Sequence, residues 1–312
     1  MLAIATGTRS SLSKLKPKDF VLSVRPLTSG QNVDSNRLSG QYALITGSTS
    51  GIGLAVAKRL ASRGCNVVLT GYGNVDKALS EVKASLVPEQ KNQAHYIPAD
   101  LTKDSEVLKL YDESCKVMKR PVNILVNNAG FQHVSPIHEF PLDIYHNMMH
   151  VMLDAPFILI KCVLPGIIGL FFFQKKKKHK WGRIINIAST HGLVASPNKS
   201  AYVAAKHGLV GMTKSIGLEL CQPLFKQVNC TCNVICPGWV ETELVQKQIY
   251  ERMKKSNRNY EQESFALVSE KMPKGEFVQP HHVAHMVDHL CQEASDVING
   301  TSIPIDGCWT VL

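Results

Sequence analysis

The chain has no uninterrupted apolar run of the length that a membrane crossing requires. Its most apolar stretch, Ala155 to Phe173, contains Lys161 and two prolines, and the longest charge-free part is 12 residues. A bilayer needs about 20 such residues. We therefore predict a buried helix in this stretch and no transmembrane segment.

Cysteine is present without any pattern of pairing. The nine cysteines are an odd number, are scattered through apolar segments and show no metal-ligand spacing, which favours free thiols in a reducing compartment over a disulfide framework. His281, His285 and His289 share one helical face, but no cysteine or acid completes a set of ligands, so we predict no metal.

Acidic residues are missing from the first 18 positions. Residues 1–40 hold six basic and two acidic side chains among many hydroxyl residues, a pattern typical of mitochondrial import segments. We predict a mitochondrial targeting peptide or a disordered tail over 1–40. The expected location is the mitochondrial matrix, or the cytoplasm if the segment is not an import signal.

The remaining positive charge is equally local. Five lysines and no acid fall in residues 166–181, around the low-complexity run FFFQKKKKHK, so these two segments account for nearly all of the net charge of +10. The run is interpreted as a non-catalytic surface insertion or as a gene-model error. The rest of the chain is almost neutral, which argues against a nucleic-acid partner.

From Tyr42 onward, short apolar runs alternate with amphipathic segments. Strands are predicted at 42–46, 66–70, 94–99, 123–127, 183–189, 230–236 and 301–305, and helices near 52–63, 75–86, 103–118, 141–164, 200–220 and from Pro280. Strands that are apolar on both faces and separated by helices predict a doubly wound parallel sheet covered on both sides. We expect one α/β domain over 41–312, with a polar segment at about 240–278 that forms a lid.

The first predicted strand is followed by TGSTSGIG, with glycines at 47, 51 and 53. A strand that turns tightly into a helix needs glycine where the backbone bends or meets a ligand. The free amides at the helix start can bind a pyrophosphate. Asp100, after the third strand, either accepts from an adenine amino group or caps a helix with Thr102. Asn127 to Gly130, NNAG, ends the fourth strand, where ligands bind in such sheets.

Three polar residues carry the predicted chemistry: Ser189, Tyr202 and Lys206. The spacing of four places the phenol and the ammonium one helical turn apart. A free phenol has a pKa of about 10, so a nearby cation is needed to stabilise its anion near neutral pH. Ser189 can hydrogen-bond the oxygen whose charge changes. The set predicts a proton relay beside a carbonyl or an alcohol.

In their order and spacing, TGSTSGIG, NNAG, Ser189 and YVAAK resemble the short-chain dehydrogenases/reductases over nearly all of residues 40–312. The resemblance implies a single-domain Rossmann-like fold. It also implies NAD as cofactor, since the second strand ends in LTGYGN with no Arg or Lys for a 2′-phosphate. The implied cofactor-binding residues are Thr46, Gly47, Ser50, Gly51, Ile52, Gly53, Asp100, Leu101, Asn128, Ala129, Gly130, Tyr202, Lys206, Pro237 and Gly238.

Longer strings are similar to the members of this family that oxidise D-3-hydroxybutyrate to acetoacetate, among them GFQH at 130–133 and CPGWVETELVQKQI at 236–249. The resemblance implies that Tyr202 is the general acid/base and that the substrate is bound by a set shared with those enzymes. The implied substrate-binding residues are Gln132, Ser189, His191, Lys199, Tyr202, Trp239 and Gln248.

One departure from the family pattern concerns the helix before Ser189, where Met152 replaces an Asn of the proton relay; Asn147 lies five residues too early to substitute. Reduced activity is therefore expected. The rival interpretations are a related reductase of another small ketone or of a 3-oxoacyl substrate, and a catalytically weak paralogue that binds NAD. The family also implies a homotetramer, in which Trp309 contributes to a neighbour's pocket.

Overall fold

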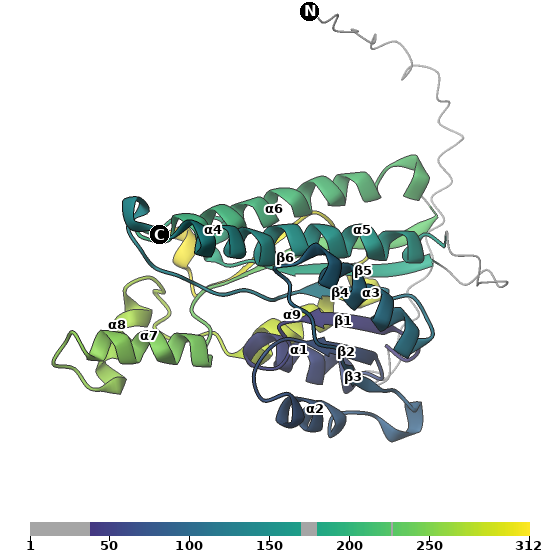
Figure 1. Cartoon of the computed structure of the whole chain (residues 1–312), viewed down its shortest axis with the longest axis horizontal. Helices are drawn as coiled ribbons and strands as arrows, with labels where there is room; N and C mark the ends of the chain where they lie inside the picture. Colours follow the sequence, from purple (N-terminus) through teal and green to yellow (C-terminus); the bar gives the residue numbers. More distant parts are fainter. Residues whose placement is uncertain (1–37, 170–179, 226) are drawn as a thin grey trace, which may run out of the picture. The chain divides into compact units, whose positions relative to one another are not determined.

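Seven apolar segments pair as one parallel sheet in the computed structural model, which describes residues 38–169, 180–225 and 227–312. The strands are β1 (Tyr42–Thr46), β2 (Asn66–Thr70), β3 (Ala94–Tyr96), β4 (Ile124–Asn127), β5 (Lys180–Ile187), β6 (Val228–Pro237) and β7 (Ser302–Ile305). Their order in the sheet is β3-β2-β1-β4-β5-β6-β7 (Figure 1). The predicted doubly wound parallel sheet is confirmed.

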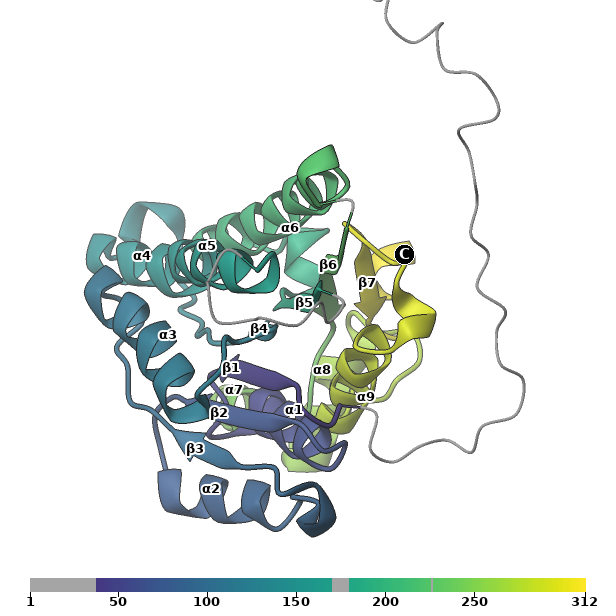
Figure 2. The same ribbon diagram turned by 90° about the vertical axis from the view of Figure 1, so that its right-hand side faces the viewer.

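Helices cover both faces of this sheet, so the strands are buried on both sides. The helices are α1 (Gly51–Ala61), α2 (Val75–Lys83), α3 (Asp104–Met118), α4 (Leu142–Met149), α5 (Ala155–Ile167), α6 (Ser200–Leu220), α7 (Glu243–Met253), α8 (Tyr260–Ser269) and α9 (Pro280–Leu290). Apolar side chains of α1 and α9 belong to one core, and those of α3 and α5 to another. Figure 2 shows α1 and α9 on one side of the sheet and α3 and α5 on the other.

A buried carboxylate joins α1 and α9, which lie on the same face of the sheet. Asp288 of α9 is 4% exposed and pairs with Arg59 at 2.6 Å and with Arg63 at 3.0 Å, both in or just after α1. Removing one partner of a buried ion pair costs about 3–5 kcal/mol. This clamp therefore holds α9 against the helix that begins at the glycine-rich turn.

The helical stretch Leu142–Ile167 is long and apolar enough, by length and composition alone, to cross a membrane. Within the fold, however, its Leu159 and Val163 side chains are fully buried against the sheet. That packing is the behaviour of a core helix, as the sequence predicted.

The segment predicted as a lid is mostly helical, because α7 and α8 lie within it. Val245 and Ile249 of α7 pack on Leu267 of α8, and Arg252 joins the two helices by pairing with Glu263 at 2.9 Å. The predictions for residues 1–37 and for most of the FFFQKKKKHK run fall outside the described residues and stay predictions.

Candidate active site

The turn between β1 and α1 contains glycines at which any side chain would collide with neighbouring backbone atoms. At Gly47, where φ is +62°, a Cβ atom would stand 2.9 Å from the Ala129 Cα. At Gly53 it would stand 2.2 Å from the Gly47 carbonyl oxygen, far inside van der Waals contact. The Gly47 contact shows that the turn packs closely against NNAG at the end of β4.

The start of α1 presents free amide groups to the same place. Ser50 precedes the helix in an extended conformation and makes no side-chain capping hydrogen bond, and no acid occupies the first turn. The unsatisfied amides and the positive end of the helix dipole attract an anion. The turn therefore fits the pyrophosphate of a dinucleotide.

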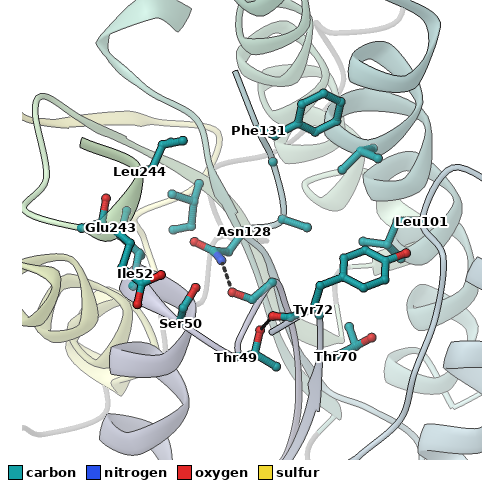
Figure 3. Close-up of a pocket in the computed structure, with 18 of the residues that line it drawn as sticks. Thr49, Ser50, Ile52, Thr70, Tyr72, Leu101, Asn128, Phe131, Glu243 and Leu244 are labelled. Carbon is teal, nitrogen blue, oxygen red and sulfur yellow. Dashed lines mark hydrogen bonds between the residues drawn. The ribbon is translucent and has the colours of Figure 1, made fainter. Parts of the chain in front are cut away.

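A cavity of 430 Å³ opens from this turn along the carboxyl ends of the strands (Figure 3). It reaches from Asp100 beyond β3 to Tyr202 and Lys206 on α6. The predicted cofactor-binding residues that line it are Gly47, Ser50, Gly51, Ile52, Asp100, Leu101, Asn128, Ala129, Gly130, Tyr202 and Lys206. A volume of this size and length suits an extended ligand.

Four predicted cofactor-binding residues lie behind the cavity wall or beside it. Thr46 supports the wall, because its hydroxyl accepts from the Asn128 amide at 2.9 Å and from the Ala129 amide at 3.0 Å. Gly53 provides the close approach described above. Pro237 and Gly238 are outside the lining, and a Cβ atom on Gly238 would meet the Met272 sulfur at 3.1 Å.

Several lining residues were not predicted. Together with Thr102, which the sequence suggested only as a capping partner of Asp100, the residues that complete the cavity are Thr49, Thr70, Gly71, Tyr72, Ala99, Phe131, Val151, Ile187, Ala188, Thr242, Glu243 and Leu244. The LTGYGN string at the end of β2 contained a signal for three of them. The contribution of 242–244 follows from the position of α7, whose preceding Thr242 Cγ2 lies 3.2 Å from the Cβ position of Gly51.

Both roles foreseen for Asp100 are compatible with its position. The carboxylate lines the cavity and also accepts from the Thr102 amide at 3.0 Å and from the Thr102 hydroxyl at 2.7 Å. These hydrogen bonds, with Lys103 nearby, lower the pKa of Asp100 to about 2. The group is therefore a permanently charged acceptor.

Ser189, Tyr202 and Lys206 come together as the sequence predicted. Ser189 follows β5 and accepts from the His191 amide at 3.2 Å, while α6 carries the other two on one face. The Lys206 ammonium donates to the Ile187 carbonyl at 2.8 Å and lies 5.7 Å from the centre of the Tyr202 ring. The sheet edge and the helix thus place three proton-bearing groups at the end of the cavity.

The causes of the Tyr202 pKa shift differ from the expectation that Lys206 has the largest effect on that pKa. Burial raises the pKa of Tyr202, and hydrogen bonds to Gln132 and Ser189 oppose that rise. Burial also lowers the pKa of Lys206 to about 8. A buried ammonium with such a pKa exchanges protons easily near neutral pH, as a relay requires.

The residues proposed to bind substrate form a second group beside Tyr202. The Tyr202 and His191 rings lie edge to face with centroids 5.8 Å apart, and the Lys199 ammonium lies 4.8 Å from the centre of the Trp239 ring. Burial lowers the pKa of Lys199 to about 8 and, with help from Lys199, that of His191 to about 4. The pocket therefore holds one cation and one neutral imidazole.

Trp309 packs against this group within its own chain, and its predicted contribution to a neighbour's pocket stays a prediction. It is 6% exposed, with its ring centroid 5.3 Å from that of His191 and 5.6 Å from that of Trp239. The short helix after β7 brings it there, and nothing in its local sequence indicated so direct a contact.

The two predicted glutamines have different positions. The Gln132 side-chain oxygen is buried and makes no hydrogen bond with the described residues, so a polar ligand can satisfy it. Gln248 lies half-buried on α7 in the lid, outside the cavity lining. The structure therefore brings Gln132 into the site and leaves Gln248 at its margin.

Met152 lies in a π-helical turn, His150–Asp154, between α4 and α5. Such turns frequently mark functional sites, and this one coincides with the kink expected from the family pattern. The methionine is completely buried among Met148, Ala201 and Ala205. Its sulfur lies 3.1 Å from the Cβ position of Gly130. An apolar side chain thus fills the space beside the cavity and α6.

These features are those of a short-chain dehydrogenase, and the family model with that description matches residues 41–252. The chain belongs to this family. It is 43% identical over 274 residues to D-beta-hydroxybutyrate dehydrogenase of Cupriavidus necator, covering 87% of this chain and 98% of that protein. It is 41% identical over 270 residues to D-beta-hydroxybutyrate dehydrogenase of Rhizobium meliloti, covering 86% and 98%.

A crystal structure of levodione reductase shows the same fold, with a TM-score of 0.74 at 24% identity over 88% of this chain and 99% of that one. Family membership makes the protein an oxidoreductase and implies a nicotinamide cofactor. The glycine-rich turn, the free helix amides and the long cavity fit such a dinucleotide.

Proposed function

We propose that this protein oxidises D-3-hydroxybutyrate to acetoacetate, reversibly, with NAD as cofactor. The observation that carries the proposal is the Lys199 ammonium. Its residue is only 9% exposed, and no acidic side chain among the described residues pairs with it. A buried cation without a counter-charge is costly, and a small carboxylate bound next to it offsets that cost.

The surroundings of Lys199 favour a short acid. The ammonium lies over the Trp239 ring, which packs on the Trp309 ring, and the Trp239 ring nitrogen is buried without a hydrogen-bond partner among the described residues. His191 adds a neutral imidazole, and the unsatisfied Gln132 side-chain oxygen is an acceptor that a substrate hydroxyl can satisfy. A carboxylate needs donors such as the Lys199 ammonium and the Trp239 ring N–H, and the indole faces suit a small apolar end.

With the carboxylate at Lys199, the secondary alcohol reaches the Tyr202 side of the pocket. Tyr202, as the phenolate, then takes the proton of the 3-hydroxyl group, and Ser189 donates a hydrogen bond to the oxygen as it becomes a carbonyl. The neutral amine of Lys206 accepts the proton that the phenol releases to become the phenolate, and its pKa of about 8 lets it pass that proton on to solvent. When bound, NAD supplies the hydride acceptor.

The choice of NAD over NADP is supported at the end of β2. The lining residues there are Thr70, Gly71 and Tyr72, and no Arg or Lys from this strand end reaches the cavity. Within the described residues Lys206 is the single basic side chain in the lining, and it lies at the Tyr202 end. A 2′-phosphate would therefore lack a cation.

The decisive assay mixes the full-length protein with NAD and D-3-hydroxybutyrate and follows the absorbance of the reduced nicotinamide. We expect turnover with the D enantiomer, little with the L enantiomer and a strong preference for NAD over NADP. Binding of NAD without turnover of any short 3-hydroxy acid would overturn the proposed substrate and support the catalytically weak paralogue.

A further inference from the structure

Glu243 is an acidic residue in an unexpected place. It is the first residue of α7 and lines the cavity together with Ser50, Gly51 and Ile52, and Figure 3 shows it beside Ser50 and Ile52. These are the residues of the turn that fits a pyrophosphate. A carboxylate therefore shares the space that an anionic ligand needs.

Nothing nearby neutralises this carboxylate. The ion pairs of α7 are made farther along the helix, by Arg252 and Lys254, and Glu243 pairs with no basic side chain among the described residues. Asp100 also lines the cavity, but Thr102 and Lys103 satisfy it. Glu243 is thus an exposed carboxylate without an ionic partner among the described residues, at the part of the cavity next to the start of α1.

The start of α7 and the start of α1 also meet there. The Thr242 methyl lies 3.2 Å from the Cβ position of Gly51, so the start of α7 lies against the glycine-rich turn that begins α1. A carboxylate in the first turn of a helix is favourable when no other anion is present. A pyrophosphate in the same region would be repelled by it.

We propose that Glu243 is an internal competitor of the dinucleotide pyrophosphate and limits the affinity for NAD, so that the cofactor is released readily. This inference rests on the cofactor assignment of the proposed function, but not on the substrate.

The test is the dissociation constant of NAD for wild type and for Glu243→Gln, measured by calorimetric titration at low and high salt. Removing one charge a few ångströms from the pyrophosphate is expected to tighten binding about three- to tenfold. The difference should shrink in about 1 M salt, where the screening length falls to about 3 Å. Adenosine, which carries no phosphate, should bind both proteins equally.

Glu251→Gln is the matched control, because Glu251 is exposed on the same helix and pairs with Lys254. It lies about 12 Å along the helix from Glu243, so the affinity for NAD should not change. Unchanged or weaker binding of NAD by Glu243→Gln would overturn the inference. Wild type that binds NAD but oxidises no hydroxy acid would refute only the substrate, whereas a failure to bind NAD would overturn both proposals.

Discussion

The Trp309 indole stands edge to face against the His191 imidazole, with the ring centroids 5.3 Å apart and the planes at 78°. His191 follows β5 and Trp309 follows β7, so the contact spans the strand between them. Asp306 holds the short helix of Trp309 by accepting from the Thr310 amide at 2.9 Å and its hydroxyl at 2.7 Å. The residues that follow β7 therefore pack against the group proposed to bind substrate.

Trp309→Ala should widen the proposed substrate pocket. A methylene group in an apolar pocket is worth about 1–3 kcal/mol of discrimination, so we expect kcat/KM for D-3-hydroxybutyrate to fall by about 10- to 100-fold while five- and six-carbon 3-hydroxy acids gain relative to it. Trp309→Phe should be intermediate. An unchanged ratio between four- and six-carbon substrates would show that Trp309 does not limit chain length.

Tyr202→Phe should abolish most of the turnover, because the phenol is the group placed to take the substrate proton. A positioned acid/base contributes about 10²- to 10⁴-fold, and a loss in that range is expected in kcat with little change in NAD binding. Tyr145→Phe, a change at a partly exposed tyrosine outside the cavity, serves as control. Full activity of Tyr202→Phe would remove the phenol from the mechanism.

The Lys199 ammonium predicts how substrate affinity depends on pH. Because burial lowers its pKa to about 8, the cation is present below that pH and is lost above it. The KM for hydroxybutyrate should therefore rise as the pH increases through about 8. Lys206 titrates in the same range, so the KM must be separated from kcat.

Lys199→Arg distinguishes the two lysines. A guanidinium stays charged throughout this range, so the rise in KM should disappear, while any effect of Lys206 on kcat remains. Lys199→Met should raise KM at every pH. A rise in KM near pH 8 that persists in Lys199→Arg would assign the titration to another group.

Met152→Asn should separate activity from stability. If the asparagine side-chain amide restores a polar group to the proton path beside Lys206, kcat should rise. Because the site is fully buried among apolar side chains, the same change should lower the free energy of unfolding by about 1–3 kcal/mol. Met152→Leu should keep both near wild type. Unchanged turnover in folded Met152→Asn would mean that this position does not limit catalysis.

Much of the fold and of the catalytic group could be predicted because the information is local. The strands were recognisable as apolar runs, although β3 ends at Tyr96, earlier than expected. Gly47 and Gly53 were identifiable because only glycine tolerates that turn. Tyr202 and Lys206 share a face because an α-helix repeats every 3.6 residues.

The tertiary structure alone decided which distant segments complete the site and what burial does to their charges. Glu243 lines the cavity and Trp309 contacts His191 through the packing of the lid helix and of the last strand, and neither position follows from the spacing of nearby residues. Likewise, the sequence suggested that Lys206 sets the pKa of the phenol. Burial of the phenol has the largest effect on the pKa of Tyr202. The effect of burial depends on every atom packed around the phenol rather than on one neighbour along the chain.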